Sequence, residues 1–123
     1  MANDRRASEL RQEIRRLTAE RATVEREFLH RHRMLAASLV ERHLGTQRSK
    51  RESAAFYLSW AREGRTRLRY VAKDRLPAVR QAVEAWRAFR TRLRRWRVLS
   101  RRLEALWREL AEAQAQSPEE FPS

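Results

Sequence analysis

The sequence predicts a mainly α fold, in which two long antiparallel helices pair as in a coiled coil and carry a β-hairpin at one tip. Residues 4–44 and 75–114 repeat apolar side chains every three or four positions, which is the helical period. Between them, residues 55–72 alternate with a two-residue period, which is typical of half-buried strands. Two glycines and three prolines leave few places to turn. We therefore expect a single domain spanning residues 1–123.

The segment 4–44 contains no glycine or proline and predicts one helix that stops near Gly45. Its apolar residues form a heptad seam, in which Arg21 and Arg31 occupy two of the positions. These arginines either lie at the edge of the seam or fix its register. The seam continues loosely through Leu39 and Leu44, and its regular positions are Leu10, Ile14, Leu17, Val24, Phe28 and Leu35.

Two segments lack any periodic pattern. Residues 45–54 are polar and basic, and we expect a mobile connection that orders on a phosphate backbone. Residues 115–123 contain two prolines and two glutamates, which predicts a disordered tail.

The hairpin register is predicted from the parity of its side chains. A loop of three residues, 62–64, places Phe56, Leu58 and Trp60 opposite Tyr70, Leu68 and Thr66. It also places Tyr57, Ser59 and Ala61 opposite Arg69, Arg67 and Arg65. A two-residue loop at 63–64 mixes apolar and charged residues on each face instead. The sequence therefore predicts the longer loop, with one apolar face and one arginine face.

The second helix is expected over residues 75–114, with Pro77 in its first turn. Its apolar side chains stand three or four positions apart from Val79 to Leu110. Two helices of matched length joined through a hairpin favour an antiparallel pair. That pair buries only a narrow seam and leaves Val98 and Trp107 outside it. We expect a second copy of the chain or another protein to cover the remainder.

Positive charge is concentrated in the middle of the chain. The formal net charge is +13, and residues 42–102 hold 19 Lys and Arg against four Asp and Glu. This density is the electrostatic signature of a nucleic-acid-binding protein. An acidic protein partner and a membrane surface are the alternatives, and a solvated helix face is the simpler interpretation for the glutamate-rich first helix. The preference for arginine over lysine reflects either phosphate and base recognition or codon bias.

Candidate nucleic-acid-binding residues fall in the connection, in the hairpin and along the second helix. Tyr57 on the arginine face would stack on an exposed base or cover the arginine stems. The complete candidate set is Arg48, Lys50, Arg51, Tyr57, Arg65, Arg67, Arg69, Lys73, Arg87, Arg90, Arg94, Arg97 and Arg101.

No enzyme constellation is visible, so the chain is expected to be no enzyme and to need no cofactor. There is no cysteine, and His30, His32 and His43 do not have metal-ligand spacing on a helix. No apolar run approaches the roughly 20 residues of a membrane span. The charged N-terminus lacks the apolar core of a signal peptide, so we expect a cytoplasmic protein without a membrane partner.

One further pattern runs through the hairpin and the second helix: Phe56-Tyr57-Leu58-Ser59, Gly64-Arg65-Thr66-Arg67, Tyr70-Val71, Val79, Val83, Trp86 and Phe89-Arg90. In this pattern, which covers roughly residues 38–110, the chain resembles a family of uncharacterised small prokaryotic proteins associated with mobile elements. That family has a coiled-coil helix, a YYLS strand, a GKTR turn, a strand ending in Tyr-Val and a C-terminal helix. This chain lacks the family's Cys knuckle before the hairpin and has Ala72 in place of a proline. The resemblance implies a role in handling nucleic acid.

These features together predict a non-enzymatic nucleic-acid-binding accessory subunit of a nucleoprotein or mobile-element complex. The alternative is a coiled-coil adaptor or scaffold protein that recruits a protein partner through its helices, with the charge serving an acidic partner. The choice between DNA and RNA stays open.

Overall fold

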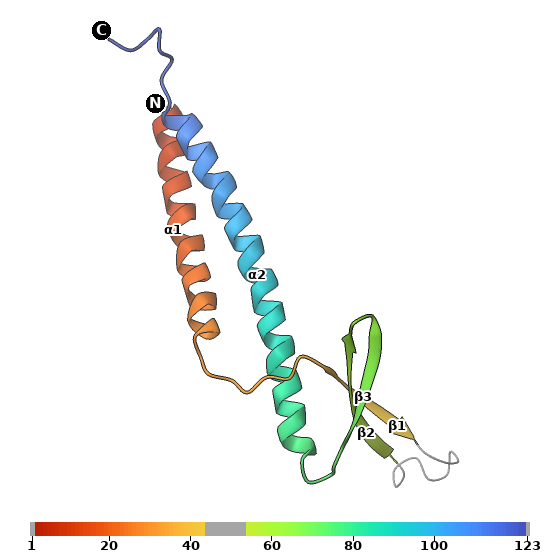
Figure 1. Ribbon diagram of the computed structural model, residues 1–123. Coiled ribbons are helices and arrows are strands. Elements are labelled where there is room, and N and C mark those ends of the chain that lie inside the picture. Colours follow the sequence, from red (N-terminus) through yellow and green to blue (C-terminus); the bar gives the residue numbers. More distant parts are fainter. Residues whose placement is uncertain (1, 44–53, 123) are drawn as a thin grey trace. The chain divides into compact units, whose positions relative to one another are not determined.

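The computed structural model describes residues 2–43 and 54–122. The elements in chain order are α1 (Ala2–Phe28), β1 (Ser38–His43), β2 (Ala54–Arg62), β3 (Arg65–Val71) and α2 (Leu76–Gln114) (Figure 1). The predicted mainly α class is confirmed, because the two helices contain most of the described residues. The chain forms two compact units, which we call the helical unit (Met1–His30 with Thr91–Ser123) and the sheet unit (Arg31–Arg90). The expectation of a single domain stays a prediction.

The core of the helical unit lies between α1 and the C-terminal part of α2. Side chains at three- and four-residue steps on each helix face one another, and Leu10 is only 1% exposed. Val24 and Ala113 are partly buried against this cluster. Its buried members are Ala7, Leu10, Ile14, Leu17, Leu99, Leu103, Leu106 and Leu110. Burial of this apolar stripe is what stabilises two helices that are otherwise highly charged.

Ion pairs connect the same two segments and show that they run in opposite directions. Arg6, near the start of α1, bonds Glu109 near the end of α2, with Nε donating to Oε1 over 3.0 Å. Glu27, near the end of α1, lies 4.0 Å from Arg92. Such exposed pairs stabilise a fold by at most about 1 kcal/mol each, so they orient the helices more than they hold them together.

The prediction of a helix over 4–44 is wrong beyond Phe28. The chain leaves α1 through a tightened turn, in which the amide of His30 donates to the carbonyl of Glu27 over 3.3 Å. Residues 38–43 of the predicted helix form β1 instead. The physical reason is tertiary: an isolated two-stranded hairpin is marginal in water, and Leu39 and Val40 extend it to three strands. Two matched long helices carrying a lone hairpin are therefore not what the chain forms.

The sheet unit contains one antiparallel sheet with strand order β1-β2-β3. One face, which we call the helix-facing side, carries Phe56, Leu58 and Val71, and it lines two hollows together with Val79 and Val83 of α2. The amide of Leu35 donates to the carbonyl of Ala82 over 3.0 Å and ties the segment before β1 to α2. The opposite face, which we call the open side, leaves Leu68 44% and Tyr70 57% exposed.

The predicted hairpin register is wrong by one residue. The loop is the two residues Glu63 and Gly64, both at positive φ (53° and 75°), and Arg62 pairs with Arg65. Two consecutive positive φ angles match the type I′ turn, whose twist suits paired strands. Leu58 therefore lies opposite Arg69 rather than Leu68. The sheet tolerates this mixing because arginine stems cover apolar neighbours while their guanidinium groups stay in water.

The remaining elements follow the sequence more closely. The second helix begins at Leu76 and ends at Gln114, within one residue of the prediction at its start. The connection 45–54 lies outside the described residues except for residue 54, which opens β2. Where the sequence predicted a disordered tail, the described part contains a turn in which the amide of Glu120 donates to the carbonyl of Ser117 over 3.0 Å.

Candidate functional site

The three hairpin arginines lie on the helix-facing side of β3. Arg65, Arg67 and Arg69 occupy alternate positions, and all three are exposed. Within the described part of the chain, none of them has a hydrogen bond or an ion pair. Elsewhere in the described sheet unit, Glu41 Oε1 lies 3.6 Å from His43 Nε2. These guanidinium groups are therefore not neutralised by the described carboxylates.

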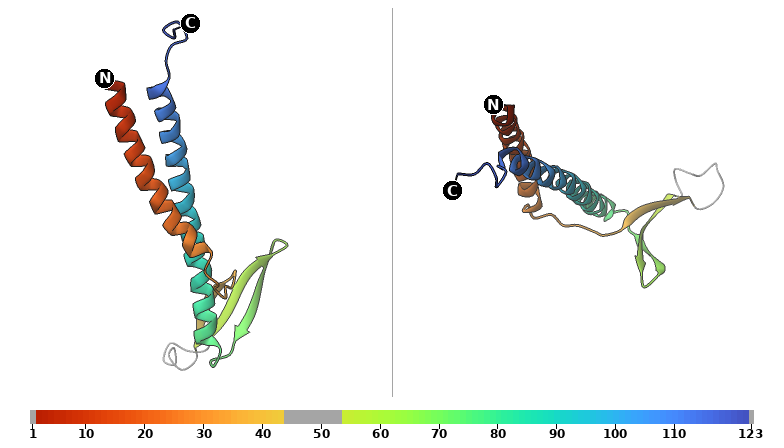
Figure 2. Two further views of the ribbon diagram at one scale, coloured as in Figure 1. Left: turned by 90° about the vertical axis from the view of Figure 1, so that its left-hand side faces the viewer. Right: turned by 90° about the horizontal axis from the view of Figure 1, so that it is seen from above.

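The end of the hairpin is a two-stranded ribbon, which we call the hairpin tip (residues 60–67). β1 extends only as far as the pair Ser38–Ser59, so it leaves the tip without a third strand. Figure 2 shows this part of β2 and β3 as a twisted ribbon. On the helix-facing side of the tip, Trp60 lies opposite Arg67 and Arg62 lies opposite Arg65. An indole ring and three arginines thus share one face, with the ring half-buried and the arginines exposed.

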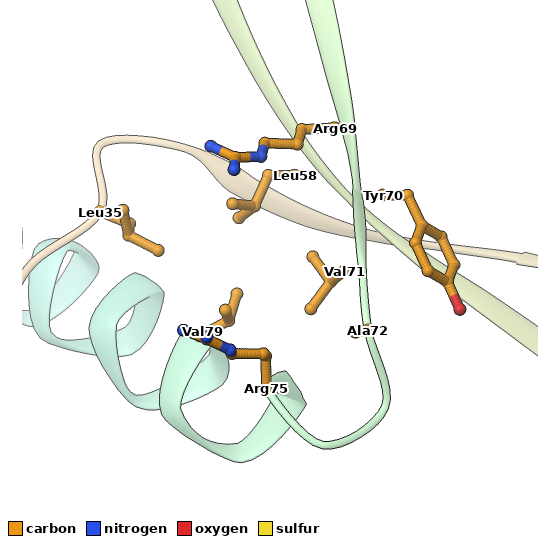
Figure 3. A pocket seen from close by; sticks show the side chains of 8 residues that line it. All are labelled: Leu35, Leu58, Arg69, Tyr70, Val71, Ala72, Arg75 and Val79. Carbon is orange, nitrogen blue, oxygen red and sulfur yellow. The ribbon is translucent and has the colours of Figure 1, made fainter.

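A cleft of about 460 Å³ opens between the base of this face and the start of α2. Its lining is apolar where Leu58 meets Val71 and Val79, and the side chains of Arg69 and Arg75 stand on two sides of it (Figure 3). The ring of Tyr70 points away from Leu58 and Val71 (Figure 3). Two cations beside an apolar surface are suited to bind an anionic group. The cleft therefore extends the positively charged surface of the tip toward α2.

The prediction that Tyr57 shares a face with the hairpin arginines is wrong. The one-residue shift in register places it on the open side, opposite Tyr70. The two rings meet edge to face, with centroids 5.7 Å apart and planes at 70°. The guanidinium carbon of Arg42 lies 5.5 Å from the centroid of Tyr57. Tyr57 is therefore engaged by its own sheet rather than presented beside the arginines.

Two candidate arginines of α2 belong to the sheet unit. Arg87 and Arg90 are exposed, and neither has an ion pair with another described residue. Arg87 lines a shallow hollow with Phe56 and Glu84. Arg80, two turns before Arg87, is used within the fold, because its guanidinium carbon lies 5.5 Å from the ring centroid of Phe56.

The other three candidates on α2, Arg94, Arg97 and Arg101, are exposed residues of the helical unit. Arg94 donates to the hydroxyl of Thr91 over 3.2 Å and has no carboxylate partner among the described residues. Arg101 lines a hollow together with Glu104, Glu109 and Glu112, so it lies in a mixed-charge environment. It is the least suited of the three to hold a phosphate.

Several other arginines of the helical unit are paired with carboxylates. Arg92 lies 4.0 Å from Glu27, and Arg95 bonds Glu20. Arg16 donates to Glu13 over 2.6 Å, and this hydrogen bond, aided by the charges of Arg16 and Arg102, holds the pKa of Glu13 below its usual range against the effect of burial. The charge of the helical unit is thus largely internally balanced.

The remaining candidate nucleic-acid-binding residues lie in a turn or outside the described residues. Lys73 is exposed in the turn between β3 and α2. Arg48, Lys50 and Arg51 lie outside the described residues. Among residues 2–43 and 54–122, no three His, Cys, Asp or Glu side chains come together as metal ligands. No described helix is long and apolar enough to cross a membrane.

Sequence reasoning missed Trp60, Arg62 and Arg75 as neighbours of the hairpin arginines. Trp60 was assigned to an apolar face because the longer loop sorted the faces by polarity. The dipeptide Glu63-Gly64 was the signal for the correct register, since a glycine at the second position of a two-residue loop favours the type I′ turn.

Comparisons with known proteins identified no similar protein. No protein-family model, no curated protein and no solved structure matches this chain. The resemblance to the mobile-element-associated family therefore stays a prediction.

Proposed function

We propose that this chain is a non-enzymatic nucleic-acid-binding accessory subunit of a nucleoprotein or mobile-element complex. The contact surface is the helix-facing side of the hairpin together with Arg87 and Arg90 of α2 in the same unit, and the ligand is the phosphate backbone of DNA or RNA.

One observation supports this proposal: the two units differ in how far their arginines are paired with carboxylates. In the helical unit, Arg6, Arg92 and Arg95 are paired with glutamates across the helices. In the sheet unit, residues 31–90 contain 15 Lys and Arg against five Asp and Glu. Arg65, Arg67 and Arg69 have no carboxylate partner in the described chain. Exposed arginines without internal partners are suited to release counterions from a polyanion, which is the main source of phosphate-backbone affinity.

Replacement of matched arginines tests the proposal. A triple variant, Arg65→Gln, Arg67→Gln and Arg69→Gln, removes three unpaired charges, whereas the control Arg92→Gln with Arg95→Gln removes two paired ones. Electrophoretic mobility shift on DNA and RNA should show a large loss for the triple variant and a small change for the control. Losses in proportion to the number of charges removed, three against two, would mean that only total charge matters, and the proposed surface would be abandoned.

A second candidate function is an adaptor that recruits a protein partner through the helical unit. The observation that favours it is an apolar groove lined by Phe28, Leu29, Leu93 and Trp96, in which Leu29 is 83% exposed. Exposed apolar surface of this kind is typical of protein interfaces. Capture of a defined partner that survives nuclease treatment and is lost in Leu29→Glu, together with no mobility shift on DNA or RNA, would favour this function over the first.

A further inference from the structure

We propose that the hairpin tip selects single-stranded nucleic acid, with one base stacked on Trp60 and the neighbouring phosphates held by Arg62, Arg65 and Arg67. This inference rests on the proposed nucleic-acid-binding function and adds the class of strand that is bound.

Trp60 is placed where it can contact a ligand together with the arginines. The observed register puts its side chain on the same face as the tip arginines and directly opposite Arg67. Trp60 is half-buried, so part of its surface is open to a ligand and the rest is covered by the protein. A partly covered tryptophan is suited to stack on a planar partner, since an indole side chain has few rotatable bonds to order on binding.

The ring of Trp60 has cationic neighbours on the sheet. Arg62, Arg65 and Arg67 flank it on both strands, are exposed and have no hydrogen bond or ion pair in the described chain. Indole and guanidinium groups together recognise a ligand that is both planar and anionic. A nucleotide in a single strand offers both, because its base is unstacked and its phosphates lie on each side.

A duplex is not the favoured ligand of this face. In a duplex the base faces are stacked on one another and only their edges are accessible in the grooves. An aromatic ring surrounded by cations then adds nothing to phosphate binding. The proposed selectivity therefore depends on access to the face of a base.

The opposite face of the same hairpin supplies a matched control. Tyr70 is 57% exposed, more open than Trp60, but it lies on the open side against Tyr57. On that side β1 contributes Arg42, whose guanidinium group is positioned over the ring of Tyr57. Aromatic exposure alone would make Tyr70 the stacking residue, whereas shared placement with the arginines selects Trp60.

The experiment compares three ligands of equal length at one salt concentration: oligothymidylate, an abasic single strand with the same phosphates, and a DNA duplex. Fluorescence anisotropy should show the tightest binding to oligothymidylate. Trp60→Leu should weaken binding to oligothymidylate by about fivefold or more and leave the abasic strand unchanged, since stacking contributes roughly 1–3 kcal/mol per base. Trp60→Phe should retain part of the preference, and Tyr70→Leu should retain all of it.

Each other outcome has a definite meaning. Equal affinity of the wild-type protein for oligothymidylate and the abasic strand would overturn the inference and leave phosphate binding intact. Loss of the preference in Tyr70→Leu but not in the Trp60 variants would place stacking on the open side and overturn it as well. Absence of binding to every ligand at low salt would overturn the proposed function itself. Circular dichroism checks folding, and if Trp60→Leu unfolds, Trp60→Phe and the wild-type comparison decide.

Discussion

Trp60 of β2 lies directly opposite Arg67 of β3. This pair identifies the register of the hairpin, and with it the chemical character of both sheet faces. A shift of one residue would return Trp60 to an apolar face and would bring Tyr57 beside the arginines, because neighbouring side chains on a strand point to opposite faces.

The register is testable by disulfide formation, since the natural chain has no cysteine. Ala61→Cys with Thr66→Cys places the two thiols at directly opposed positions. Opposed residues at non-hydrogen-bonded positions have Cα atoms about 4.5 Å apart, within the range of a disulfide. We expect rapid oxidation of this pair, measured by loss of free thiol. Ala61→Cys with Arg65→Cys, which the three-residue loop would pair, should oxidise much more slowly, and the reverse order would contradict the register.

The core of the helical unit should be sensitive to cavities. Leu10 belongs to this core and is 1% exposed, so Leu10→Ala should lower the free energy of unfolding by about 2–5 kcal/mol. Leu29, which is 83% exposed, serves as the control, and Leu29→Ala should change it by less than about 0.5 kcal/mol. Urea denaturation followed by circular dichroism measures both. Similar losses in the two variants would mean that α1 does not bury this stripe.

Acidification should weaken the helical unit through Glu13. The hydrogen bond from Arg16 lowers the pKa of Glu13, so the folded state binds this proton less readily than the unfolded state. The resulting stability is present above the ordinary glutamate pKa and disappears as the pH falls through the lowered value. The urea midpoint of Glu13→Gln should therefore decline less than that of wild type over this acid range. Glu112→Gln, at an exposed position, should follow the wild-type decline.

The second helix was predicted well because one sequence pattern, the helical repeat of apolar residues, covers its whole length. Its apolar residues keep a helical period without interruption, and Pro77 is compatible with its first turn. The first helix was overestimated because the same period continues loosely past Phe28, where pairing of Leu39 with Leu58 takes precedence over helix propensity. Competition of this kind depends on contacts between distant residues, which a local pattern does not contain.

The candidate site was predicted in composition but not in geometry. The exposed arginines of β3 and α2 are those expected from the charge distribution. The sheet neighbours of the β3 arginines were assigned incorrectly, because the parity argument assumed that each face must be uniform in polarity. On β3 only Val71 is buried, so most of this edge strand is free to mix arginine with apolar neighbours. Turn geometry at Glu63 and Gly64 decides the register instead.

The salt dependence of binding tests the central claim most directly. The account predicts that the logarithm of the affinity for a single strand falls linearly with the logarithm of salt concentration. The slope of the Arg65→Gln, Arg67→Gln, Arg69→Gln variant should be shallower than that of wild type by about two, at roughly 0.7 per lost phosphate contact. Equal slopes in the two proteins, or an affinity that does not respond to salt, would contradict it.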